Sequence, residues 1–320
     1  MNLEEAIDQF LEYLEIEKGC SPLTVKVYGH YLRHFSDWLK EVSPQAKPED
    51  ISLDLVRRYR LYLARQTGPK GEPLKKVTQS YYIIALRALL RYLSAQRDIP
   101  VLPPEKIELP KGTPKTVTFL NSEQVERLLS SPDASDIIGL RDKAILETLF
   151  STGLRVSELV RLNRDQIDLE RKEFGVVGKG SKPRVVFLSD TAAEWLRLYL
   201  KSRDDNFKPL FIRYAGHKEL GKDGEKMRLT SRSVQKIVAK YAKRCFLPVK
   251  TSPHTLRHSF ATDLLIGGAD IRSVQEMLGH ESIRTTQVYT HVTDRQLREV
   301  HRAFHSRDKL TKQGEERLDR

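Results

Sequence analysis

The chain has 320 residues, a length typical of about two domains, and 39% of them are hydrophobic, which is enough to bury a core in each. Its 55 Lys and Arg residues against 43 Asp and Glu give a formal charge of +12, so nucleic acid is favoured as a partner over an acidic substrate or a membrane surface. Two isolated cysteines exclude a disulfide framework, and no apolar run approaches the roughly 18 residues of a membrane span, so we expect a cytoplasmic, nucleoid-associated protein without membrane contacts.

The first part of the chain, residues 1–102, is predicted to be a small domain of four helices. Apolar residues recur at helical spacing over 3–16, 23–39, 53–63 and 77–93. Basic residues interleaved with tyrosines follow these helices, and each is explained equally well as a solvated surface residue. As a hypothesis, the DNA contacts of this domain come from Lys26, Arg57, Arg58, Lys75, Lys76 and Arg87.

A proline-rich segment separates this domain from the rest. Five prolines fall between residues 100 and 114, a density that disfavours helix and favours an extended connector. We therefore expect a linker over residues 103–117 and a second domain over 118–320 that ends in a C-terminal tail. Residues 1–102 contain 15 Lys and Arg and 13 Asp and Glu, so most of the positive excess belongs to the second part.

The second part opens with a helix-capping signal at 121–124, ahead of predicted helices over 125–129 and 136–150. The pattern breaks at Gly153 and resumes over 154–160, so Arg155 lies just past a glycine break. A β-hairpin is predicted next, with strands over 174–177 and 184–188. Its glycine-bearing tip carries two lysines, Lys179 and Lys182.

Helices return over 191–200 and 231–241, with a charged loop insertion at 203–226 between them. Ser252 and Pro253 predict the start of another helix, on which His254 and Arg257 share a face. Asp270 caps a short helix that ends before His280. Ser282 then caps a helix carrying Tyr289.

This inventory of side chains suits attack on a phosphodiester without a metal ion. Two arginines can bind the non-bridging oxygens, a tyrosine can act as nucleophile, and a lysine can protonate the leaving 5′-oxygen. A tyrosine hydroxyl with a pKa near 10 needs help from a base or from neighbouring cations, for which His254 and His280 are candidates.

Four motifs carry a resemblance to a known family. They are TGLRVSEL at 152–159, GKGSK at 178–182, HTLRHSFAT at 254–262, and LGH at 278–280 followed nine positions later by Tyr289 in VYTH. In these motifs and over nearly its whole length the chain resembles the tyrosine recombinases of the phage integrase family, most closely those of the Xer type.

The resemblance implies a fold that is mainly α with a small β-sheet, in which a helical core-binding domain precedes a mixed α/β catalytic domain. It implies that Tyr289 forms a 3′-phosphotyrosyl bond with DNA, that Glu158 supports the arginine site, and that no cofactor is needed. The activating residues would be Arg155, Lys179, His254, Arg257 and His280.

The resemblance also implies the partners. These are double-stranded DNA with paired half-sites and a homotetramer on two duplexes, which exchanges C-terminal tails and passes through a Holliday junction. The expected role is Xer-like resolution of chromosome or plasmid dimers, and a partner recombinase or an activating protein remains open.

Taken singly, each of these residues has an ordinary explanation as a surface arginine or a half-buried tyrosine, and only the ordered set overturns it. Lys182 competes with Lys179 as the acid and is assigned to a phosphate contact instead. His254 and His258 form an H-x-x-x-H pattern, but no third ligand accompanies it, so no metal site is expected.

Other functions remain open at this point. Residues 271–289 have the length of a helix-turn-helix, as in a non-catalytic DNA-binding regulator. A type IB topoisomerase or an integrase or transposase of a mobile element would share the chemistry. The topology of the DNA product separates these classes.

Overall fold

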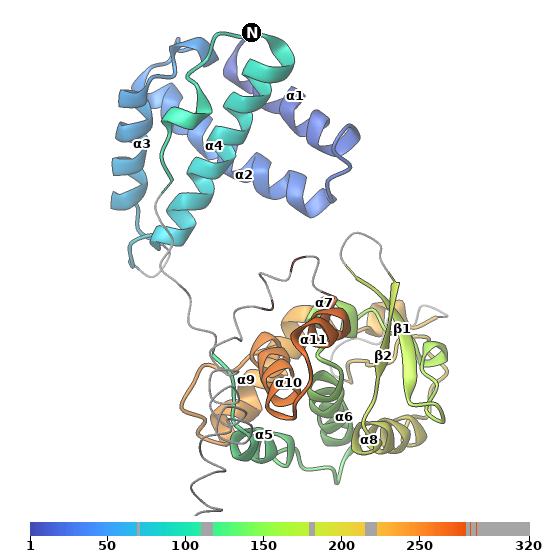
Figure 1. Cartoon of the computed structure of the whole chain (residues 1–320). Helices are drawn as coiled ribbons and strands as arrows, with labels where there is room; N and C mark the ends of the chain where they lie inside the picture. The colour runs from blue at the N-terminus through green and yellow to red at the C-terminus, as the bar shows by residue number, and fades with distance from the viewer. Residues whose placement is uncertain are drawn as a thin grey trace, which may run out of the picture. The chain divides into compact units, whose positions relative to one another are not determined.

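The computed structural model describes residues 1–68, 71–109, 118–178, 183–214 and 223–279, together with Ser282 and Thr286. The chain divides into two compact units, Met1–Pro114 and Lys115–Arg320, and each is described by itself. Both units are mainly helical, and the second also contains a two-stranded sheet (Figure 1), so the predicted fold class is confirmed. Within the described ranges, no helix combines the length and the apolar character that crossing a membrane requires.

Four helices form the first unit, and three of them begin at a polar cap. The side chains of Asn2, Ser21 and Ser52 each accept a hydrogen bond from a backbone N–H of the first turn. The last helix packs against the other three, and aromatic residues such as Phe35 and Tyr59 are buried between them. The helices are α1 (Leu3–Ile16), α2 (Pro22–Val42), α3 (Leu53–Arg65) and α4 (Lys76–Arg97), with a 3-10 turn, η1 (Pro48–Asp50), between α2 and α3.

The beginning of the expected linker packs against this first unit. Residues 103–109 include a 3-10 turn, η2 (Pro104–Lys106), and Ile107 is buried in the helical core. Arg87 Nε donates to the carbonyl oxygen of Pro104 at 2.9 Å. An apolar side chain within the expected linker is therefore bound to the adjacent core.

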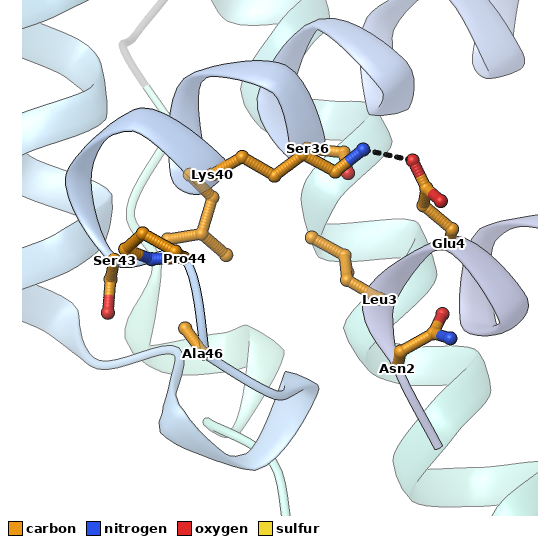
Figure 2. A pocket seen from close by; sticks show the side chains of 9 residues that line it. Asn2, Leu3, Glu4, Ser36, Lys40, Ser43, Pro44 and Ala46 are labelled. Carbon is orange, nitrogen blue, oxygen red and sulfur yellow. Dashed lines mark hydrogen bonds and ion pairs between the residues drawn. The ribbon is translucent and has the colours of Figure 1, made fainter.

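A cavity of about 230 Å³ lies where the start of α1 meets the end of α2 (Figure 2). Leu3 and Ala46 line it, and an ion pair between Lys40 and Glu4 crosses its rim. Both of these charged side chains are more than half exposed. Since these charges are exposed and already paired with each other, the cavity is a weak candidate for a reactive site, and the candidate chemistry belongs to the second unit.

The second unit is built around α6, a helix in which every residue from 141 to 149 is buried. It packs against four other helices and one strand, so its apolar residues form the centre of the core. The helices are α5 (Ser122–Leu129), α6 (Ile137–Thr152), α7 (Val156–Leu159), α8 (Asp190–Lys201), α9 (Ser231–Arg244), α10 (Pro253–Ile266) and α11 (Ile271–Leu278), with 3-10 turns η3 (Arg164–Gln166) and η5 (Glu225–Met227).

The predicted hairpin is present as strands β1 (Glu173–Val177) and β2 (Pro183–Phe187), which pair antiparallel. Phe174, Val176 and Val186 are buried in the core. On the other face, Val185 and Phe187 are exposed. The register pairs the last residue of β1 with the first residue of β2. Lys179 and Lys182, in the tip that joins the two strands, lie outside the described residues.

Candidate active site

The glycine break between α6 and α7 sets the position of Arg155. Gly153 ends α6 in the left-handed conformation (φ 60°), and a Cβ atom at this residue would lie 2.4 Å from Cδ1 of Phe260. Only glycine therefore fits the turn without displacing α10. Two residues later, Arg155 takes an extended conformation as the N-cap of α7, where its backbone N–H donates to Oε2 of Glu158 at 2.8 Å.

The second predicted arginine reaches the same place from α10. Ser252 caps this helix and Pro253 begins it, as the sequence predicts. The guanidinium of Arg257 is buried, with Nη1 donating to the carbonyl oxygen of Gly153 at 2.6 Å and Nη2 to that of Leu278 at 2.6 Å. Arg257 therefore connects the glycine break to the end of α11.

Three arginines converge on the C-terminal end of α11. Arg184 Nε donates to the carbonyl oxygen of Met277 at 3.2 Å, Arg257 Nη2 to that of Leu278, and Arg155 Nη2 to that of Gly279 at 3.2 Å. We call these three side chains the arginine cluster. The last carbonyls of a helix have no partner within it and form its negative end, so this position favours cations.

Glu158 is the carboxylate within the arginine cluster. Its side chain is 7% exposed and accepts hydrogen bonds from both Arg155 and Arg184. Burial by itself raises the pKa of Glu158, but the hydrogen bonds and charge of Arg184, together with those from Arg155, outweigh it and lower the pKa to about 2. Glu158 is therefore ionised at neutral pH, as a group that orients arginines must be.

His254 lies on α10 within the field of the arginine cluster. The surrounding protein desolvates its ring and the charges of Arg257 and Arg155 act on it, so its pKa lies below the usual value. The ring of His258 packs edge-on against it, with centroids 4.1 Å apart. Burial, followed by the influence of His254 and Arg257, lowers the pKa of His258 to about 4. Both imidazoles are thus neutral at pH 7.

Within the described part of the chain, no group of three His, Cys, Asp or Glu side chains is arranged to hold a metal ion. Of the predicted site residues, the structure brings together Arg155, Glu158, His254 and Arg257. The other predicted members, Lys179, Lys182, His280 and Tyr289, lie outside the described residues.

The arrangement can bind an anion at the exposed edge of the arginine cluster. The Arg155 side chain is 33% exposed, and described contacts use two of the five N–H donors that a guanidinium carries. A phosphate oxygen would find further donors there, in a fixed orientation. The neutral imidazole of His254 lies close enough to be affected by the same charges.

The DNA-contact candidates of the first unit lie on α2 and α3, at the start of α4 and, for Arg87, in the middle of α4. All of them except Arg87 are exposed: Lys26, Arg57, Arg58, Lys75 and Lys76. Arg87 is half-buried and uses its Nε–H within the unit, on the carbonyl oxygen of Pro104. A contact of Arg87 with DNA would therefore have to use its remaining donors.

Arg184 is the site residue that the sequence reasoning missed. It follows Pro183 at the start of a strand with a 2-residue alternation, where a charged residue is typical of a solvent-facing position. Its side chain is instead 11% exposed. The sequence offered one signal that Arg184 lies near the site: it follows the lysine-bearing tip by two residues, on the strand that leads away from that tip.

Comparisons with known proteins agree on one family. The family described as "Phage integrase family" matches residues 118–296, and "Phage integrase, N-terminal SAM-like domain" matches residues 7–97. Tyrosine recombinase XerD of Listeria innocua is 38% identical over 310 residues, which cover 95% of this chain and 100% of that protein. Tyrosine recombinase XerC of Pelotomaculum thermopropionicum is 37% identical over 307 residues, which cover 95% of this chain and 98% of that protein.

A solved structure also resembles this chain. The structure of the XerH site-specific recombinase bound to difH substrate, a pre-cleavage complex, matches with a TM-score of 0.66 and 25% identity. The match covers 92% of this chain and 83% of that one.

Proposed function

The chain belongs to the phage integrase family and is a tyrosine site-specific recombinase, and we propose that it resolves chromosome or plasmid dimers as an Xer-type enzyme. The Xer-type role is supported by relatives named XerC and XerD that match 95% of the chain. The observation that carries the catalytic assignment is the convergence of Arg155 and Arg257, from segments about 100 residues apart, on one helix end beside His254.

In the proposed reaction, Arg155 and Arg257 bind the non-bridging oxygens of the scissile phosphate and stabilise the negative charge of the pentavalent transition state. The hydroxyl oxygen of Tyr289 attacks phosphorus and forms the 3′-phosphotyrosyl bond, while the bond to the 5′-oxygen breaks. Lys179 gives its proton to that oxygen, and the free 5′-hydroxyl of the partner strand later reverses the step.

Two further roles concern the proton of Tyr289 and the alignment of Arg155. A neutral imidazole can accept a proton, so His254 is a candidate to take the one that Tyr289 loses, with His280 as the second candidate. Glu158 fixes the orientation of Arg155 by accepting two hydrogen bonds, one from its backbone N–H and one from its guanidinium. Lys182 and the basic residues of the first unit contact the DNA backbone and determine affinity, which falls as salt is raised.

The proposal includes a homotetramer on two duplexes, which exchanges strands through a Holliday junction and passes residues 309–320 from each protomer to its neighbour. The exchange of tails is supported by a cavity of about 290 Å³ on the second unit, whose lining includes the apolar side chains of Phe150, Phe260 and Leu264. It could receive Leu310 or Leu318 of the tail, both outside the described residues. We also propose nucleoid association, and a partner recombinase or an activating protein where the two recombination sites differ.

The test of this function is a suicide substrate that carries a nick next to the cleavage site, so that the released fragment diffuses away. Wild-type protein is expected to accumulate a covalent adduct that survives a denaturing gel. Tyr289→Phe should bind the same DNA with unchanged affinity and form no adduct, because it lacks only the hydroxyl. An adduct formed by Tyr289→Phe would refute the assignment of the nucleophile.

The same assay addresses the alternatives. Adduct formation should persist in excess EDTA, because the proposed oxygen partners are side chains, whereas a two-metal nuclease stops. A non-catalytic regulator would bind without any adduct, and a topoisomerase would relax supercoils without joining two sites. Sequencing the bound DNA distinguishes a chromosomal dimer-resolution site from the end of a mobile element.

A further inference from the structure

Arg184 lies at the tip end of the hairpin, in β2, and contacts two other elements of the site. Its Nη1 and Nη2 donate to Oε1 and Oε2 of Glu158 at 3.0 and 2.9 Å, a bidentate pair, while Nε donates to the carbonyl oxygen of Met277 at 3.2 Å. One guanidinium thus joins β2 to α7 and to the end of α11. With 11% of the side chain exposed, these contacts are shielded from water.

The carboxylate of Glu158 is shared evenly between two arginines. Oε1 accepts from Nη1 of Arg155 (2.9 Å) and from Nη1 of Arg184, and Oε2 accepts from the backbone N–H of Arg155 (2.8 Å) and from Nη2 of Arg184. The bidentate bond from Arg184 fixes the plane of the carboxylate. That plane in turn determines where the Arg155 guanidinium points.

Without Arg184, Glu158 would lose the partner that fixes its orientation, together with the hydrogen bonds and charge that do most to lower its pKa. Its remaining described donors would be the backbone N–H and the flexible side chain of Arg155, which leave the carboxylate freer to rotate, and the Arg155 guanidinium would move with it. The removal would also leave the carbonyl oxygen of Met277 without the described donor, at a helix end that borders His280 in the sequence.

We propose that Arg184 is a positioning residue for DNA cleavage, which acts through Glu158 to align Arg155 on the scissile phosphate. The inference rests on the proposed function, because it requires that Arg155 bind that phosphate. It assigns Arg184 no contact with DNA. A purely structural brace, or a support for the hairpin lysine Lys179, are the competing explanations that the experiment must exclude.

The full-length protein is compared in single-turnover cleavage of the suicide substrate, with protein in saturating excess so that binding does not limit the rate. Arg184→Met keeps the length of the side chain and removes all its donors. We expect cleavage to slow about 100-fold, the size typical of misplacing a catalytic group by about 1 Å, with half-site affinity within about threefold of wild type. Arg184→Lys keeps the positive charge but cannot form the bidentate pair, so it should cleave about tenfold faster than Arg184→Met and about tenfold slower than wild type.

Arg203→Met is the matched control for loss of a buried arginine. The Arg203 side chain is fully buried, pairs with Asp205 and donates to the carbonyl oxygens of Pro209 and Leu210, which lie outside the arginine cluster. Its replacement should lower the melting temperature and leave the cleavage rate of the folded protein within about threefold of wild type. Equal slowing by Arg203→Met and Arg184→Met would make Arg184 a structural brace.

Two further measurements identify the path through which Arg184 acts. In a Glu158→Gln background, Arg184→Met should slow cleavage by less than about threefold, because the carboxylate through which Arg184 acts on Arg155 has already been removed. A 5′-thio leaving group, which departs without a proton, should not restore the rate of Arg184→Met. Additive losses in the double variant, or full rescue by the 5′-thio substrate, would overturn the proposal, the second in favour of support for Lys179.

Failure of the proposed function has a different signature, since wild-type protein would then form no adduct at all. A normal adduct in wild type with unchanged cleavage by Arg184→Met would refute the role of Arg184 alone. If Arg184→Met shows no cooperative melting transition, Arg184→Lys decides the question. A folded Arg184→Lys protein that cleaves at the wild-type rate would count against the need for bidentate geometry.

Discussion

Gly153→Ala should destabilise the second unit and disturb its arginine cluster. The methyl group would lie 2.4 and 2.8 Å from two ring atoms of Phe260 and 3.1 Å from Cδ2 of Leu278, at a backbone φ of 60°. Left-handed backbone costs alanine roughly 1–2 kcal/mol, and overpacking a core adds typically 1–3 kcal/mol. The smaller entropy of the unfolded alanine chain offsets about 0.4–1 kcal/mol, so we expect a net loss between about 1 and about 4.6 kcal/mol.

Two other glycines separate these contributions. Gly268 has a positive φ of 97°, and a methyl group added to it would meet no atom within 4 Å, so Gly268→Ala reports backbone strain alone and should cost about 1 kcal/mol. Gly175 lies in β1, outside the positive-φ group and with nothing within 4 Å, so Gly175→Ala should be close to neutral. The excess loss in Gly153→Ala over Gly268→Ala measures the steric clash.

The assay is urea unfolding followed by tryptophan fluorescence. The chain has two tryptophans, Trp38 in the first unit and Trp195 in the second, so a Trp38→Phe background leaves Trp195 to report the catalytic unit. Because the carbonyl oxygen of Gly153 accepts from Arg257 at 2.6 Å, Gly153→Ala should also slow cleavage under folded conditions. The reasoning fails if Gly153→Ala loses no more stability than Gly268→Ala.

Three further outcomes are expected. Lys179→Ala should slow cleavage of a normal 5′-oxygen substrate far more than that of a 5′-thio substrate, whereas equal slowing would move the acid to Lys182 or elsewhere. Since burial and neighbouring groups lower the pKa of His258 to about 4, the folded unit binds fewer protons than the unfolded chain from the ordinary histidine pKa of 6.5 down to that value. Stability should therefore fall as the pH is lowered through this window, and His258→Asn should flatten the slope in urea titrations at successive pH values; an unchanged slope would contradict it. Deleting residues 309–320 should leave binding to a single half-site unchanged and weaken cooperative pairing, and wild-type cooperativity in the truncated protein would identify the tail as a frayed end.

Local patterns predicted the helices well, because caps and apolar spacing act over a few residues. Helix α1 has the predicted bounds, 3–16, and α10 begins at the proline that the sequence marked. The segment 203–226, which its charged composition predicted to be a loop insertion, is partly buried. Leu210 and Phe211 lie in the core, and the side chain of Arg203 is fully buried beside Asp205. Only tertiary packing bends that segment back onto the unit, and no short periodicity reports it.

The sequence named Arg155, His254 and Arg257 from local motifs and Glu158 through the family resemblance, and the structure brings these four together. The sequence did not predict the contacts that join them. That Arg184 joins them depends on a strand, a short helix and a helix end brought together from three parts of the chain. An arginine in a strand is expected to be exposed until the buried carboxylate opposite it is known.

The way in which arginines are neutralised distinguishes this site from the rest of the second unit. Elsewhere among its described residues, Arg141, Arg203 and Arg228 each pair with a different carboxylate, those of Asp142, Asp205 and Glu225. Two of these carboxylates also have a second, longer ion pair: Asp142 with Lys240 at 3.8 Å and Asp205 with Arg164 at 3.9 Å. In the arginine cluster, the described contacts of three guanidinium groups include one carboxylate, that of Glu158, and the other acceptors are backbone carbonyl oxygens.

This difference leaves positive charge where a phosphate would bind. Three cations and one anion give the arginine cluster a net charge of about +2, and the end of α11 offsets only about half a unit of it. Carbonyl oxygens hold the guanidinium groups in place without cancelling their charge, whereas a second carboxylate would do both. An anionic phosphate would therefore complete the charge balance of the site, while the backbone contacts keep the donors oriented before it arrives.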